Sequence, residues 1–208
     1  MIGLYRPIVV AIAAVLLVGT GSGLAIAQST ESTPVAAFDV AATLDGTREI
    51  DADALADLAR ERVRLGAEWL AQVQRSSGAF YYIYDPDDDE YEAQQYNEVR
   101  HAGTTYSLYQ AYGLLGDESI FLVAEQAGEF IREISVAVEG AGRAYTDPQN
   151  NDTSLGGQAL AIVALMERRR VTEDTTADPL IEEMASFLLW MEMTDDPGRY
   201  YFSYDHTS

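Results

Sequence analysis

The sequence predicts an all-α domain of helical hairpins in two layers, with short aromatic-rich extended segments between the hairpins. The chain has 208 residues and is 48% hydrophobic, which is enough apolar surface to build a core. Helices with one apolar face alternate with helices that are apolar or small over most of their surface. This order is expected when a chain passes repeatedly between an outer and an inner layer, whereas a simple bundle would contain one-faced helices throughout.

Residues 1–27 have the pattern of a secretion signal. Arg6 precedes the unbroken apolar run Ile8–Val18, and the small-x-small sequence Ala25–Ala27 offers a cleavage site. The apolar run is shorter than the ~20 residues that a membrane-spanning helix needs. We therefore expect a cleaved signal, a secreted or cell-envelope location outside the cytoplasm, and no stable membrane association afterwards. The alternative is an uncleaved anchor over residues 8–27.

The rest of the chain divides into a flexible linker at residues 28–50 and a folded domain at residues 51–208. The linker is rich in Ser, Thr and Ala and has no sustained periodicity. One-faced helices are predicted at about residues 51–74, 118–134 and 179–192, and the intervening helices at about 97–115 and 155–168. Leu155–Met166 has one polar side chain in twelve positions, so we expect this helix to be buried on every side.

A repeated motif follows the one-faced helices. Gly78–Asp85 recurs as Gly198–Asp205, and Gly142–Asp147 is a degenerate third copy. A spacing of roughly one helical hairpin per copy is typical of a repeat architecture. The alternating aromatic side chains predict a short extended segment in each copy.

The first copy and the helix before it resemble the repeat of α/α toroids. The pattern Trp-Leu…Gln…Gly-x-aromatic of terpenoid cyclases and prenyltransferases is matched by Trp69-Leu70, Gln74 and Gly78-Ala79-Phe80, and more weakly by Phe187-Leu188, Glu192 and Gly198-Arg199-Tyr200. Six-hairpin glycosidases, polysaccharide lyases and sugar epimerases have a similar double-layered barrel. The resemblance implies a partial α/α toroid over about residues 60–205. Phe80 and Tyr200 replace the usual Trp and Glu192 replaces Gln, so only the architecture is carried over and no catalytic residue.

A closed toroid contains more helices than the five expected in this chain. We therefore expect the chain to be a fragment of a longer protein. The alternative is a complete small protein whose open edge pairs with another copy.

Composition excludes several classes of chemistry. The absence of cysteine excludes disulfides, thiol nucleophiles and thiolate metal sites. All 13 basic residues are arginine, which excludes lysine Schiff-base chemistry and a Walker-type phosphate loop. The net charge of -21 argues against nucleic acid as a partner, because phosphate binding needs clustered positive charge.

Polar residues at the start of the 97–115 helix form the main candidate site. Glu98 and His101 are three positions apart, hence on one helical face, and a carboxylate beside an imidazole can share proton transfer near neutral pH. Arg100 is a candidate for binding a substrate carboxylate or sugar hydroxyl. The structural alternative is that Arg100 pairs with the acidic loop and His101 fills a packing gap.

Two reaction types use these residues differently. Hydrolysis of a glycosidic bond needs two carboxylates that flank the bond, and Asp85 and Glu98 are the candidates. Lyase or epimerase chemistry would instead use His101 or a tyrosine as the base.

Further candidates line the same entrance. The aromatic set consists of Tyr82, Tyr84, Tyr96 and Tyr106. Aromatic faces stack on sugar rings and on isoprenoid cations, and the alternative is packing between repeats. Gln158, alone among apolar neighbours, either faces the barrel axis as a binding residue or satisfies a nearby backbone group.

The sharpest acidic cluster is Asp85–Glu90. Its Asp-x-Asp-Asp sequence resembles the proton-donating motif of cyclases that protonate an alkene, which would make Asp87 or Asp88 the acid. Oxygen ligands at Asp85, Asp87 and Asp89 would suit calcium, although the glycine and distal glutamate of an EF-hand are absent. The plain interpretation is a solvated acidic turn, with no metal site and no cofactor.

These features predict an exported carbohydrate-active protein of the glycoside hydrolase, lyase or epimerase type, with a saccharide as its partner. Two alternatives stay open. One is a terpenoid-cyclase-like enzyme, and the other is a non-catalytic envelope module that binds a partner.

Overall fold

The computed structural model describes residues 51–85, 87–92 and 95–207. The predicted signal at 1–27 and linker at 28–50 lie outside the described residues. Helix α3 (Ala52–Gln72) extends across two compact units, and the second unit begins at Arg64. The fold described below is that of the second unit. Within the described part of the chain, no helix combines the length and apolar character needed to cross a membrane.

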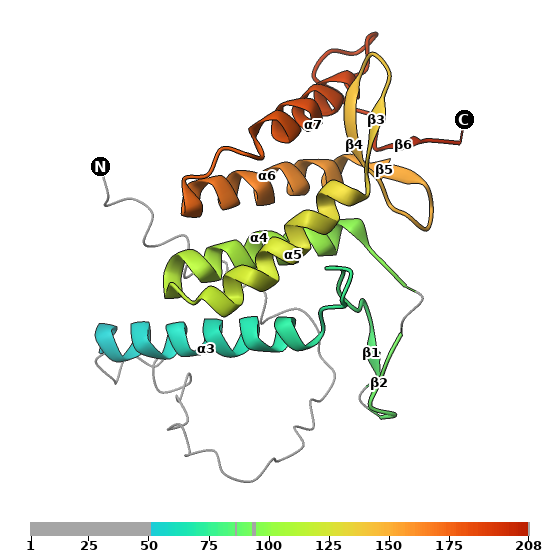
Figure 1. Cartoon of the computed structure of the whole chain (residues 1–208). Helices are drawn as coiled ribbons and strands as arrows, with labels where there is room; N and C mark the ends of the chain where they lie inside the picture. Colours follow the sequence, from blue (N-terminus) through green and yellow to red (C-terminus); the bar gives the residue numbers. More distant parts are fainter. Residues whose placement is uncertain (1–50, 86, 93–94, 208) are drawn as a thin grey trace, which may run out of the picture. The chain divides into compact units, whose positions relative to one another are not determined.

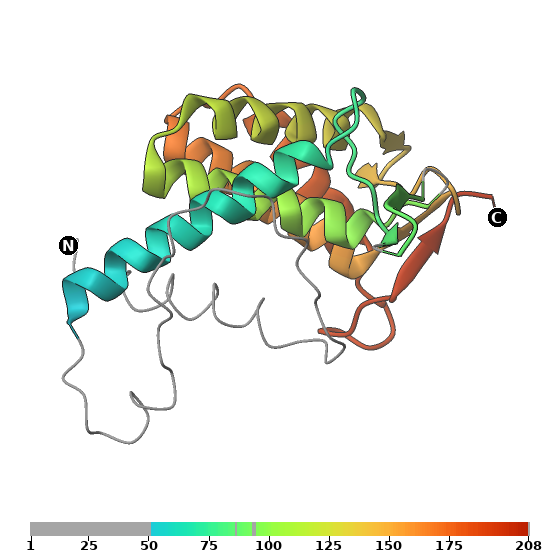
Figure 2. The same ribbon diagram turned by 90° about the horizontal axis from the view of Figure 1, so that it is seen from below.

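The described chain is mostly helical, as predicted. The helices after α3 are α4 (Glu98–Leu115), α5 (Glu118–Glu133), α6 (Leu155–Thr172) and α7 (Asp178–Trp190). Six short strands form three antiparallel pairs: β1 (Tyr84–Asp85) with β2 (Glu90–Tyr91), β3 (Ser135–Val138) with β4 (Gly142–Tyr145), and β5 (Asp152–Ser154) with β6 (Ser203–Asp205). Strand β6, near the end of the described chain, lies beside β5 (Figure 2).

The helix boundaries have local causes. Asn97 and Ser154 precede α4 and α6, and their side chains accept hydrogen bonds from the backbone N–H of Arg100 (2.9 Å) and Gly157 (3.0 Å). These bonds satisfy donors that a helix start leaves without an intrahelical partner. Helix α4 ends at Gly116, whose φ of 67° lies in the left-handed region that glycine adopts without strain.

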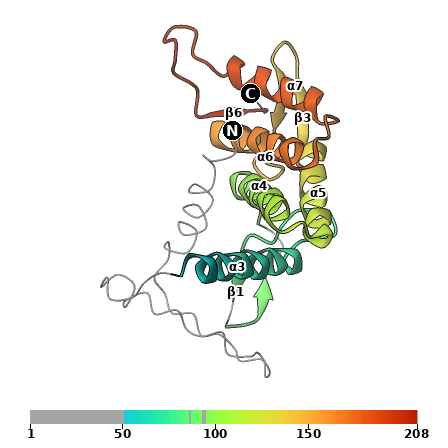
Figure 3. The ribbon, with the colours of Figure 1, turned by 90° about the vertical axis from the view of Figure 1, so that its left-hand side faces the viewer.

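Helices α4 and α6 pack directly on each other, and each also contacts its own hairpin partner. Figures 1 and 3 show α6 between α4 and α7, with α5 beside α4. Glycines permit the close approach of α4 and α6: a Cβ at Gly103 would lie 3.1 Å from Leu160, and one at Gly113 would lie 2.8 Å from Val171. The shared core includes Ala102, Ile131, Tyr145, Ala161, Leu165 and Met184.

The prediction that Leu155–Met166 is buried on every side is wrong. Gly156 is exposed, and the side chains of Val163 and Met166 are 42% and 53% exposed. Phe187 on α7, by contrast, is completely buried. The reason is geometric: α4, α7 and β4 cover part of the circumference of α6, and an apolar stripe remains on the uncovered side.

The two strong copies of the sequence repeat share backbone hydrogen bonds on either side of the glycine loop, although the loop itself is two residues longer in the second copy. In the first, Tyr81 N–H donates to Val73 O (3.0 Å) and Arg75 N–H to Ala79 O (2.7 Å). In the second, Tyr201 N–H donates to Met191 O (3.0 Å) and Met193 N–H to Arg199 O (2.8 Å). The antiparallel bridges Gln74–Phe80 and Glu192–Tyr200 complete the match. The sequence alignment of the two copies therefore agrees with the structure from the glycine to Tyr81 and Tyr201.

The third copy follows the same plan with a longer hairpin. Gly142–Tyr145 forms β4 and pairs with β3, so Ala144 faces Val136 as Phe80 faces Gln74. Its glycine is also in the left-handed half of the backbone map, with φ values of 90° at Gly78 and 127° at Gly142. The hairpin motif thus recurs after α3, α5 and α7.

Candidate functional site

A small pocket between the Gly78 loop and the first turns of α4 contains part of the predicted site. We call it the His101 pocket. Its volume is about 160 Å³, and its walls include Phe80, Tyr82, Tyr96, Arg100 and His101. Trp69, which also lines the pocket, comes from α3, Phe80 and Tyr82 come from the segment after it, and Tyr96 directly precedes α4, which supplies Arg100 and His101.

His101 is the buried polar group of this pocket. Its side chain is 3% exposed and lies among aromatic rings, with centroid distances of 5.3 Å to Phe80, 5.7 Å to Tyr96 and 5.1 Å to Phe130. Nε2 lies 3.0 Å from the carbonyl oxygen of Ala127 on α5, while Nδ1 is buried with no hydrogen-bond partner among the described residues. A carbonyl can only accept, so Nε2 carries the proton and Nδ1 is an acceptor.

Burial also fixes the charge of His101. Desolvation lowers its pKa to about 4, because the charged imidazolium would lose its hydration in the aromatic surroundings. The ring is therefore neutral near pH 7. This charge state agrees with an unpartnered Nδ1 that can accept a hydrogen bond from a hydroxyl group.

Arg100 lies at the mouth of the same pocket and is exposed. Its guanidinium stacks on the Tyr82 ring at 4.6 Å from the ring centroid. Stacking on the ring fixes the plane of the guanidinium. Its N–H groups lie in that plane, at the edge of the stack, where they can donate to a ligand. The pairing of Arg100 with Tyr82 was not predicted from the sequence, although both residues were candidates for binding.

Glu98 does not line the His101 pocket. It is buried, and its Oε1 accepts a hydrogen bond from Ser154 Oγ at 2.7 Å. Its backbone carbonyl accepts from Tyr145 Oη at 3.1 Å. Glu98 therefore fastens the start of α4 to the start of α6, whereas His101 bonds to α5. Their spacing of three residues places them on adjacent parts of α4 with different neighbours.

Asp85 and the acidic cluster lie on an exposed hairpin. The Asp85 side chain accepts from Asp87 N–H at 2.9 Å, and Tyr84 Oη donates to Asp89 at 2.8 Å. Tyr84 also packs against Tyr91 on β2, with a centroid distance of 4.9 Å. Within the described ranges, no group of three or more His, Asp or Glu side chains is arranged to hold a metal ion.

Gln158 forms hydrogen bonds with backbone groups, which is the second of the two roles expected from the sequence. Oε1 accepts from Tyr145 N–H at 2.7 Å, and Nε2 donates to the carbonyls of Arg143 and Met184, both at 2.9 Å. All three bonds are made by a fully buried side chain. Gln158 thus joins α6, β4 and α7.

Tyr106 also has a packing role. It is half-buried against the shared core, and its hydroxyl accepts a hydrogen bond from Gln110 at 2.7 Å. Burial raises the pKa of Tyr106 and, with a larger shift, that of Tyr96. Both phenols therefore stay protonated near neutral pH, which does not favour either as a base.

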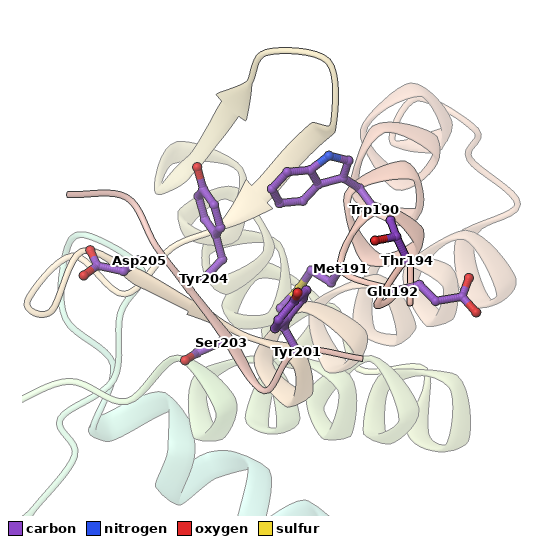
Figure 4. Close-up of a pocket in the computed structure, with 8 residues that line it drawn as sticks. All are labelled: Trp190, Met191, Glu192, Thr194, Tyr201, Ser203, Tyr204 and Asp205. Atoms are coloured by element: carbon purple, nitrogen blue, oxygen red, sulfur yellow. The ribbon is translucent and has the colours of Figure 1, made fainter. Parts of the chain in front are cut away.

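Sequence reasoning missed a second and larger pocket in the C-terminal copy. Its volume is about 420 Å³. Figure 4 shows its lining residues: Trp190, Met191, Glu192, Thr194, Tyr201, Ser203, Tyr204 and Asp205. In this view the carboxylates of Glu192 and Asp205 point away from the aromatic rings at the centre. Glu192 Oε1 accepts from Gly198 N–H at 2.6 Å, so this carboxylate holds the loop closed.

Sequence reasoning also missed the role of Arg168. It is buried, and it donates to Glu125 on α5 (2.7 Å and 3.0 Å) and to Asp174 beyond α6 (2.8 Å). Tyr109 Oη joins the same carboxylate at 2.8 Å. The available signal was its register: Arg168 follows Ala161 and Leu165 at helical spacing on the buried face of α6.

No family model matches this chain, and searches of curated proteins and of solved structures likewise find no match. The resemblance to α/α toroids therefore stays a prediction from the sequence pattern.

Proposed function

We propose that this chain is an exported carbohydrate-binding protein built on the α/α-toroid plan, and that the His101 pocket holds one sugar ring. The observation that carries this proposal is the buried, neutral His101, whose Nδ1 lacks a partner among the described residues in an aromatic pocket. A buried polar atom without a hydrogen bond costs about 1–3 kcal/mol, and a ligand hydroxyl would remove that cost.

The walls of the pocket suit the mixed surface of a sugar. Aromatic faces such as Phe80 and Tyr96 cover the C–H side of a pyranose, and acceptor and donor groups meet its hydroxyls. Arg100 supplies the donors, and His101 Nδ1 supplies the acceptor once the side chains that bury it shift to admit a hydroxyl. The volume of about 160 Å³ is below the ~300 Å³ at which pockets for drug-sized ligands begin, so it fits a single ring.

The same groups support binding better than turnover. A general base works best when its pKa is near the working pH, and the pKa of His101 is about 4. Glu98, the predicted catalytic carboxylate, is hydrogen-bonded to Ser154 outside the pocket. We therefore propose the non-catalytic envelope module among the functions expected from the sequence, and we take its partner to be the saccharide expected for the enzyme.

The toroid plan is supported by the order of the hairpins. Helices α4 and α6 contact each other and α5 and α7 are their hairpin partners, as inner and outer helices of a double-layered barrel would be arranged. In such a barrel the exposed stripe of α6, which includes Val163 and Met166, would line the inside of the ring.

Binding is tested by calorimetry and ligand-observed NMR with a panel of mono- and oligosaccharides. We expect at least one saccharide to bind and Arg100→Met to weaken it about tenfold or more, the effect of losing one to two charged hydrogen bonds. Arg132→Met, which removes an exposed arginine on α5, is the matched control and should leave binding unchanged.

His101→Phe provides the second variant, because it keeps an aromatic ring and removes Nδ1. We expect loss of saccharide binding while the thermal melt shows that the chain is still folded. Binding by neither the parent nor any variant, or equal affinities for the parent, Arg100→Met and His101→Phe, would overturn the proposal.

A further inference from the structure

The His101 pocket and the pocket in the C-terminal copy carry groups of opposite charge. Glu192 and Asp205 line the C-terminal pocket, and none of its described lining residues is basic. The described walls of the His101 pocket include the cation Arg100 and neither Asp nor Glu. The chain has 34 acidic residues against 13 basic ones, so the His101 pocket is a local exception to the charge of the chain.

Arg100 also differs from most arginines of the second unit, because no carboxylate of the described residues pairs with it. Ion pairs with carboxylates are made by Arg64, Arg132, Arg143, Arg168, Arg169, Arg170 and Arg199. Arg75 and Arg100 instead stack on Tyr81 and Tyr82, at 4.5 Å and 4.6 Å from the ring centroids. Both tyrosines line the His101 pocket. The arginines of this unit that the described carboxylates leave without an ion pair thus lie on the aromatic walls of one pocket.

The acidic groups that are closest to Arg100 in the sequence have other contacts. The sequence offered pairing with the acidic hairpin as an alternative, and among the described residues no ion pair joins Arg100 to that hairpin. Asp89 of the hairpin accepts a hydrogen bond from Tyr84 Oη at 2.8 Å. Glu98 accepts from Ser154 Oγ at 2.7 Å. The guanidinium of Arg100 is therefore available to an anionic group of a ligand.

We propose that the saccharide of the His101 pocket carries one acidic group, a carboxylate or a sulfate ester, and that Arg100 binds this group. The inference rests on the proposed function and adds the class of its ligand. A guanidinium can donate two parallel N–H bonds to two oxygens of either group. Arg100 also lies in the first turn of α4, where the positive end of the helix dipole favours an anion.

The charge of the whole chain limits the size of the effect. A net charge of -21 repels anions, and a polymer with many acidic groups would be repelled more strongly than a sugar with one. In ~0.15 M salt this repulsion is screened over about 8 Å, so direct contact with Arg100 has the larger weight. Because Arg100 is exposed, water competes for the contact, and we expect a moderate preference for the acidic sugar.

The test compares neutral sugars with their acidic counterparts on the full chain. The probes are the methyl glycosides of glucose, galactose and mannose, the matching uronides with a C6 carboxylate, and the matching 6-sulfates. By NMR titration, we expect at least one acidic form to bind about fivefold more tightly than its neutral counterpart. Arg100→Met should reduce this ratio of affinities to about one. The acidic form that binds more tightly identifies the group that Arg100 holds.

Two further variants separate charge from geometry. Arg100→Lys keeps the charge and loses the planar fork, so its ratio should lie between those of the parent and Arg100→Met. Arg132→Met, on α5, is the matched control and should keep the parent's ratio. Equal affinities for neutral and acidic sugars, or a ratio unchanged by Arg100→Met, would overturn this inference and leave saccharide binding in place. Binding of none of the sugars would overturn the proposed function as well.

Discussion

The Gly78 and Gly198 loops share a left-handed glycine and the flanking backbone hydrogen bonds, but they differ in length and in surroundings. Gly78 is pressed against α5, and the residues after it, Ala79 and Phe80, are buried. Gly198 is open, and the corresponding residues are an exposed Arg199 and a half-buried Tyr200. Close cover by a helix therefore accompanies buried side chains after Gly78, and its lack accompanies exposed ones after Gly198.

The largest loss of stability is expected when a Cβ is added to a glycine that lies against a helix. Gly142→Ala should lower the free energy of unfolding by about 3 kcal/mol or more, since a left-handed backbone strain adds to an overlap with Glu183. Gly140→Ala, two residues away in an open turn, should cost only about 1 kcal/mol. Urea unfolding measures both losses of stability, and equal losses would contradict the close contact of Gly142 with α7.

Two glutamine side chains, Gln158 and Gln74, are bonded to backbone groups at sites that differ in burial. Gln158→Leu should cost about 3 kcal/mol, because it removes three hydrogen bonds from a fully buried side chain to backbone groups. Gln74 makes a similar bridge from a partly exposed position, with bonds to the carbonyls of Gly78 (3.1 Å) and Val123 (2.9 Å). Gln74→Leu should cost about 1–2 kcal/mol by urea unfolding. A larger loss of unfolding free energy for Gln74→Leu than for Gln158→Leu would contradict the deeper burial of Gln158.

The His101 pocket beside the Gly78 loop should make stability depend on pH. In the folded chain the pKa of His101 is about 4, below its ordinary 6.5, so the unfolded chain binds more protons between these values. The stabilising contribution is complete above pH 6.5 and is lost as the pH falls towards 4. Over this range, the parent should lose about 2 kcal/mol more unfolding free energy than His101→Phe does. Parallel pH profiles of the two proteins would show that His101 is not buried in neutral form.

The smallest effect is expected on the exposed acidic hairpin. Asp85→Asn removes a carboxylate whose hydrogen bond to Asp87 N–H is at the surface, and should change the unfolding free energy by at most about 0.5 kcal/mol. Saccharide affinity at the His101 pocket should also be unchanged. A loss of affinity comparable to that of Arg100→Met would mean that the hairpin belongs to the binding site.

Much of the fold was predictable because helix periodicity and the glycine motif are local signals. The five helices and the alignment of Gly78–Asp85 with Gly198–Asp205 follow from spacing alone. Burial was less predictable: a stripe of apolar residues on α6 does not reveal that Val163 and Met166 lack a neighbour. That information depends on which elements pack around the helix.

The candidate site was predictable by region and not by role. His101 and Arg100 do meet at one pocket, because both are near the start of α4 and the Gly78 loop folds over it. Glu98 has the same helical spacing, yet Ser154, from a distant part of the chain, accounts for its carboxylate. The partly buried ion pair of Arg168 with Glu125 likewise joins residues that no sequence pattern connects.

The most direct test of the repeat compares alanine at the two aligned glycines, Gly78 and Gly198. Both substitutions impose nearly the same backbone strain, so the difference in unfolding free energy isolates the contact with α5. The structure predicts that Gly78→Ala is the more destabilising by about 2 kcal/mol. Equal destabilisation of the two variants would contradict the close packing of Gly78 against α5.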